Sequence, residues 1–78
     1  MKYFIIRQIN AIGNGYNTIT ELVTDPKIEN GGIRATKVGE IDYSRYDSEN
    51  PVFKRIEPRE FLICGNVTCE ECAHPFAE

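Results

Sequence analysis

The 78-residue sequence contains no tryptophan, one methionine, one histidine and three cysteines. An odd number of cysteines excludes a fully paired disulfide framework. The sequence also lacks any apolar run near the roughly 20 residues that a membrane-spanning helix needs, and the first run, residues 3–6, is followed at once by Arg7. We therefore expect a cytoplasmic protein without membrane contact, in which the thiols stay reduced.

The shortage of nucleophile and base residues argues against catalysis. A hydrolytic triad would have to combine His74 with Ser44 or Ser48, and neither serine has the glycine pattern of a nucleophile elbow. Neighbouring carboxylates such as Glu70 and Glu71 are far more often surface residues than general acids. We predict that the protein is not an enzyme.

The length fits one small domain spanning residues 1–78. A domain of this size has a hydrophobic core worth only roughly 3 to 5 kcal/mol net, so an additional stabilising element is expected. A structural metal and association with a second copy of the chain are the two candidates that the cysteine count leaves open.

Short stretches rich in β-branched and aromatic residues predict a mainly β (small α+β) fold, with an antiparallel sheet and one or two short helical turns. The expected strands are residues 2–9, 18–24, 33–41 and 52–56. The near-continuous apolar run in the first stretch is typical of a strand buried on both faces. Asn30-Gly31-Gly32 predicts a hairpin turn, and we expect Asp25-Pro26 and Pro58 to interrupt strands.

All cysteines and the single histidine lie within eleven residues, in the order Cys64, Cys69, Cys72, His74. Thiolate sulfur and imidazole nitrogen are the ligands that tetrahedral zinc prefers, so the spacing predicts a zinc knuckle over residues 64–74. Gly65 and Asn66 would turn the backbone around the ion. A short helix after them would place Cys69 and Cys72 on one face, but would point His74 elsewhere.

Two other interpretations of this cluster remain open. Iron–sulfur or thiol redox chemistry is disfavoured, because a fourth cysteine is missing and two glutamates between Cys69 and Cys72 would raise the pKa of a thiol. The other interpretation has no metal: Cys64 is a core residue, and the last ten residues form a frayed tail.

The charge is unevenly distributed along the chain. Residues 1–39 hold five basic and three acidic side chains, whereas residues 40–78 hold four basic and nine acidic ones. An acidic half repels phosphate backbones and attracts basic partner surfaces. We therefore expect a protein partner with a basic surface and regard nucleic acid as unlikely.

The polar segment 42–50 is the expected contact surface, because its tyrosines can anchor in a partner's pockets while the charges around them steer the encounter. Its predicted contact residues are Asp42, Tyr43, Arg45, Tyr46, Asp47 and Glu49. The function predicted is a small non-enzymatic interaction module with a structural metal site, acting as an adaptor or as an inhibitor of a larger protein, including the phage-type inhibitors of host defence.

A zinc-knuckle nucleic-acid-binding protein is the alternative prediction. Its phosphate contacts would be five basic residues of the first half, with tyrosine or phenylalanine rings stacking on bases. These five residues are Lys2, Arg7, Lys27, Arg34 and Lys37.

Overall fold

The computed structural model describes residues 2–45 and 51–76 and confirms the mainly β prediction. Within these residues, five antiparallel strands form one sheet, and a single 3-10 turn follows the third strand. The elements are β1 (Tyr3–Ile12), β2 (Gly15–Glu29), β3 (Gly32–Ile41), η1 (Tyr43–Arg45), β4 (Phe53–Cys64) and β5 (Val67–Cys72). None of the described residues belongs to a helix with the length and apolarity to span a membrane.

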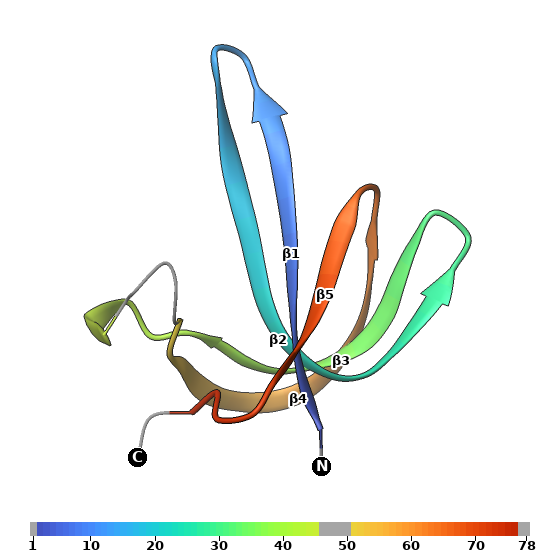
Figure 1. Cartoon of the computed structure of the whole chain (residues 1–78). Helices are drawn as coiled ribbons and strands as arrows, with labels where there is room; N and C mark the ends of the chain where they lie inside the picture. Colours follow the sequence, from blue (N-terminus) through green and yellow to red (C-terminus); the bar gives the residue numbers. More distant parts are fainter. Residues whose placement is uncertain (1, 46–50, 77–78) are drawn as a thin grey trace.

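The strand order in the sheet is β4-β3-β2-β1-β5. The first four strands form a meander, and β5 returns to pair with the free edge of β1. Strands β4 and β5 therefore lie at opposite edges of the sheet, although only Gly65 and Asn66 separate them in the chain. Such a short connection requires the sheet to curl until the end of one edge strand lies near the start of the other, as Figure 1 shows.

Two hydrogen bonds hold the connection between β4 and β5 against the rest of the sheet. The amide of Gly65 donates to the carbonyl of Gly31 at 2.8 Å, which joins this turn to the turn between β2 and β3. The side-chain amide of Gln8 in β1 donates to the carbonyl of Cys64. The Gly65 φ of 99° lies in the region that favours glycine, which explains the use of that residue in the bend.

The proline positions depart from the sequence prediction in an informative way. Strand β2 continues through Asp25-Pro26 to Glu29, and β4 continues through Pro58, so neither proline ends a strand. Both instead coincide with shifts of register, where a residue leaves the hydrogen-bonded ladder and a missing N–H costs little.

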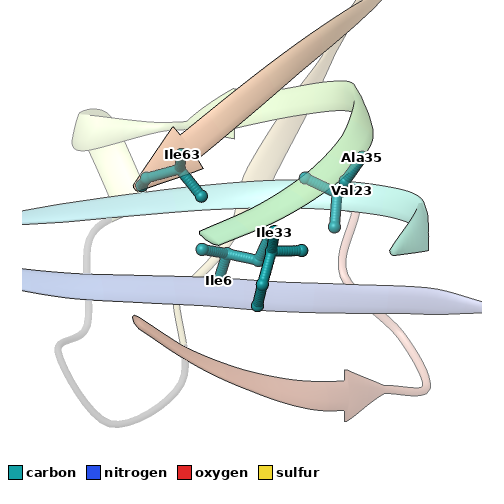
Figure 2. Packing of buried hydrophobic residues seen from close by; sticks show 5 residues of the cluster. All are labelled: Ile6, Val23, Ile33, Ala35 and Ile63. Carbon is teal, nitrogen blue, oxygen red and sulfur yellow. The ribbon is translucent and has the colours of Figure 1, made fainter. Parts of the chain in front are cut away.

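Buried side chains lie on both faces of the central strands, as the apolar run in β1 predicts. One cluster, here called the Ile6 cluster, contains Ile6, Val23, Ile33, Ala35 and Ile63 (Figure 2). The second, the Phe53 cluster, contains Ile5, Leu22 and Phe53. Because alternate residues of a strand point to opposite faces, adjacent isoleucines and the adjacent Leu22-Val23 pair supply both clusters.

The C-terminal segment covers the Phe53 cluster, so the described part of the tail is not frayed. The Phe53 amide donates to the Pro75 carbonyl at 2.9 Å. The Phe76 ring meets Tyr3 edge-on at a centroid distance of 5.3 Å, and the Arg55 guanidinium lies 3.9 Å from the centre of the Phe76 ring. Aromatic and cation–π contacts therefore hold this segment against the sheet.

Gly32, which pairs with Cys64 across β3 and β4, provides a test of this packing. A Cβ atom there would overlap the Ile63 carbonyl oxygen and lie 2.9 Å from the Cys64 Cα, so backbone would have to move. We expect Gly32→Ala to lower the free energy of unfolding by about 2 to 3 kcal/mol in urea denaturation. Gly13→Asn is the control, since a Cβ at Gly13 meets nothing within 4 Å and asparagine tolerates its φ of 53°. Equal stability of the two variants would contradict the tight pairing at Gly32.

Candidate functional site

The cysteine segment forms a strand instead of the expected short helix. Cys69 lies opposite Ile6 of β1, and Cys72 lies opposite Tyr3. Residues three apart in a strand point to opposite faces of the sheet. Consistent with this, Cys72 packs against the Phe53 cluster, whereas Cys69 shares the sheet face of Ile6. Thr68 and Glu71 have the spacing of a helix capping box, but a strand forms here because the free edge of β1 offers hydrogen bonds that outweigh this local signal.

The structure brings together only two of the four predicted ligands. Cys72 and His74 line a cleft of about 400 Å³ together with Glu70 and Glu71. Neither Cys64, at the exposed end of β4, nor Cys69 lines this cleft. Among residues 2–45 and 51–76, no group of three or more histidine, cysteine, aspartate or glutamate side chains is placed to hold a metal ion. Zinc binding by this segment stays a prediction, and it would require β5 to leave β1.

The three thiols are expected to react at different rates. Cys64 and Cys69 are exposed, while Cys72 is half-buried. Partial burial raises the pKa of the Cys69 thiol, which lowers its thiolate fraction at neutral pH. With Ellman's reagent we expect Cys64 to react fastest, Cys69 next and Cys72 last. Single Cys→Ser variants assign each reaction phase to its cysteine. Zinc held by all three sulfurs would instead protect every thiol until EDTA is added.

The predicted contact surface at residues 42–50 lies partly in the described structure. Asp42, Tyr43 and Arg45 lie at the η1 turn, whereas Tyr46, Asp47 and Glu49 lie outside the described residues. The Asp42 carboxylate accepts hydrogen bonds from the Ser44 hydroxyl at 2.6 Å and from the Ser44 amide at 3.1 Å. The Asp42 amide donates to the Val52 carbonyl at 2.8 Å. These bonds fix the turn and leave the Tyr43 side chain 79% exposed.

The Asp42 bonds give the turn a pH dependence. The Ser44 hydroxyl, above all, holds the pKa of the Asp42 carboxyl below its usual value. Because the pKa is lower in the folded state, the ionised carboxylate stabilises the turn at pH values above the unfolded-state pKa. This contribution is lost as the pH falls through the folded-state pKa. We expect Ser44→Ala to raise the Asp42 pKa in an NMR titration and Ser44→Thr, which keeps the hydroxyl, to preserve it. An unchanged pKa in Ser44→Ala would refute this role of the hydroxyl.

A second candidate surface, which the sequence analysis missed, lies on the hairpin of β1 and β2. Ile9 is 68% exposed and Tyr16 is 73% exposed. Ile9 lies opposite Thr18 and Tyr16 lies opposite Ala11, so these four side chains share one face. At the base of this face, Arg7, Ile9, Thr18, Asn66 and Thr68 line a groove of about 320 Å³. We call this the hairpin face.

The sequence held only a weak signal for the hairpin face. Apolar residues recur in β1 after Arg7 and Gln8, beyond the residues that the core uses, and a tyrosine follows Gly13-Asn14-Gly15 where a turn favours polar residues. Neither pattern distinguishes an exposed apolar residue from a buried one.

Comparisons of the chain with protein families, curated protein sequences and solved structures gave no significant match. The candidate sites therefore rest on the geometry described above.

Proposed function

We propose that the protein is a small non-enzymatic interaction module, an adaptor or an inhibitor of a larger protein, which binds its partner through the hairpin face. The observation that carries this proposal is the exposure of Ile9 and Tyr16 on a projecting hairpin. Exposed apolar side chains that gather on one face are typical of protein contact sites, and tyrosine is among the residues that contribute most to binding.

The strand pairing explains why the hairpin projects. Strand β5 pairs with β1 only from Tyr3 to Gln8, and β3 pairs with β2 only from Leu22 onward. Between these limits β1 and β2 pair only with each other, and Figure 1 shows their hairpin extending away from the rest of the sheet. The outer edges of this part are thus unpaired, and the exposed apolar side chains of the hairpin face lose water when a partner covers them.

The hairpin face and the η1 turn are neighbouring surfaces. Thr20, two residues after Thr18 on β2, lines a cleft of about 240 Å³ with Tyr43. A partner seated on Ile9 and Tyr16 therefore has a short path to the exposed Tyr43 ring. The surplus of acidic over basic side chains in residues 40–78, which include the η1 turn, favours a partner with a basic surface at that turn.

The ion pairs favour a protein partner over nucleic acid. Of the five basic residues considered for phosphate contacts, four lie within 4 Å of a carboxylate: Lys2 with Glu71, Arg7 with Glu70, Arg34 with Glu29 and Glu60, and Lys37 with Glu21. A phosphate would have to compete with these carboxylates. In a salt titration we expect no binding of single-stranded oligonucleotides even at low ionic strength, whereas the nucleic-acid alternative requires a steep salt dependence.

Site-specific photo-crosslinking tests the hairpin face. A photoreactive amino acid is placed at position 16, and the protein is expressed in its native cells. Irradiation should give one discrete crosslinked product with a partner protein. An excess of the protein without the photoreactive group should prevent this crosslink. As competitors, the Ile9→Asp and Tyr16→Glu variants should be needed at about tenfold higher concentration or more to prevent the crosslink, because a charge replaces an apolar contact. Unfolding curves establish that both variants fold.

Ile28→Asp is the matched control, since Ile28 is 91% exposed on the other hairpin, between β2 and β3. It should compete as well as the unaltered protein. The proposal would be contradicted if the Ile28→Asp variant competed as poorly as the hairpin variants. It would also be contradicted if the Tyr16→Glu variant still prevented the crosslink.

A further inference from the structure

A groove of about 500 Å³ lies on the sheet, and none of the residues that line it belongs to the hairpin face. It is lined by Tyr3, Thr24, Asp25, Thr36, Val38, Arg55, Ile56 and Pro58. These residues come from β1, β2, β3 and β4, and Tyr3 and Val38 also pack against the Phe53 cluster. The groove therefore has a floor that the core holds in place.

Irregularities in three adjacent strands create this groove. Asp25 and Pro26 stand opposite a single residue of β3, Val38 is the additional residue of β3 against β2, and residues 56–58 of β4 stand opposite Val38 alone. Such bulges bend the sheet locally. Asp25 has a φ of 53°, the one positive value outside glycine in the described residues, and it is one of the residues that line the groove.

The two charged residues of the groove have no ionic partner among residues 2–45 and 51–76. In the described part of the chain, no side chain of opposite charge lies within 4 Å of Asp25 or of Arg55. The Arg55 guanidinium is instead held over the Phe76 ring, which fixes its position and leaves its N–H donors for a ligand. The two residues lie on β2 and β4, with β3 between them, so about 10 Å of sheet separates their strands.

We propose that this groove binds a short extended peptide with free ends and apolar side chains. Its carboxylate pairs with Arg55, its amino group pairs with Asp25, and its side chains cover Tyr3, Val38, Ile56 and Pro58. Because only one strand lies between β2 and β4, a peptide of a few extended residues is long enough to reach from one charged residue to the other. The opposite charges at the two ends of an apolar floor favour a zwitterion over a fatty acid or an amine, since either of these would leave one charge facing a ligand without a partner.

Three peptides distinguish these ligand classes: trileucine, N-acetyl-trileucine and trileucine amide. In NMR titrations of the full chain, we expect trileucine to shift the amides of Thr24, Thr36 and Val38. The acetylated and amidated peptides should each bind about tenfold more weakly, because each loses one charge-assisted contact. Absence of these shifts up to millimolar trileucine, or equal affinity of the three peptides, would overturn the proposal.

Charge-removing variants assign the two ends. Arg55→Gln should bind trileucine and its amide equally, and Asp25→Asn should bind trileucine and its acetylated form equally. Arg59→Gln and Glu57→Gln are the matched controls, because they remove exposed charges from β4 without lining the groove. Should Arg55→Gln unfold, Arg55→Lys, which keeps the charge near Phe76, must retain the preference for a free carboxylate. The hairpin variants Ile9→Asp and Tyr16→Glu should bind trileucine normally, so this result is independent of the proposed function.

Discussion

The pairing of β1 with both β2 and β5 is the constraint on which the rest of the structure depends. It places Ile5 and Ile6 in the interior of the sheet, where successive side chains enter the Phe53 cluster and the Ile6 cluster. A one-residue slip would exchange the faces of all β1 side chains, and in one direction it would put Arg7 in the place of Ile6 in the Ile6 cluster. Because both clusters are small, the register of this one strand governs the position of every surface described above, including the hairpin face and the groove at Arg55.

The strands were predictable where a residue pattern alone decides the conformation. The apolar run at residues 2–9 and the glycine turn at Gly31 correspond to β1, an interior strand of the sheet, and to the β2–β3 turn that the structure shows. Pro26 and Pro58 were expected to interrupt strands, but they occupy bulges within continuous strands. The sequence shows that a proline has no N–H to donate. It does not show that the neighbouring strand has fewer residues at that position, so that the proline falls in a bulge where no N–H is needed.

The candidate sites were less predictable because they depend on contacts distant in sequence. The segment of Cys69 and Cys72 carries a helix-capping pattern, yet the open edge of β1 makes it a strand and turns the two sulfurs to opposite faces. The hairpin face exists because β5 and β3 stop pairing at Gln8 and Leu22. The groove needs three bulges in register, and no local pattern encodes such an alignment.

The order of the strands also has a consequence for how the chain acquires its structure during synthesis. The meander from β1 to β4 forms from neighbours in sequence, but the outer edge of β1 stays open until β5 has been made. An unpaired edge beside a row of isoleucines is a template for pairing with another chain. The chain is therefore most prone to aggregate in any state in which β5 has not yet paired with β1, and slow docking of β5 would lengthen that period.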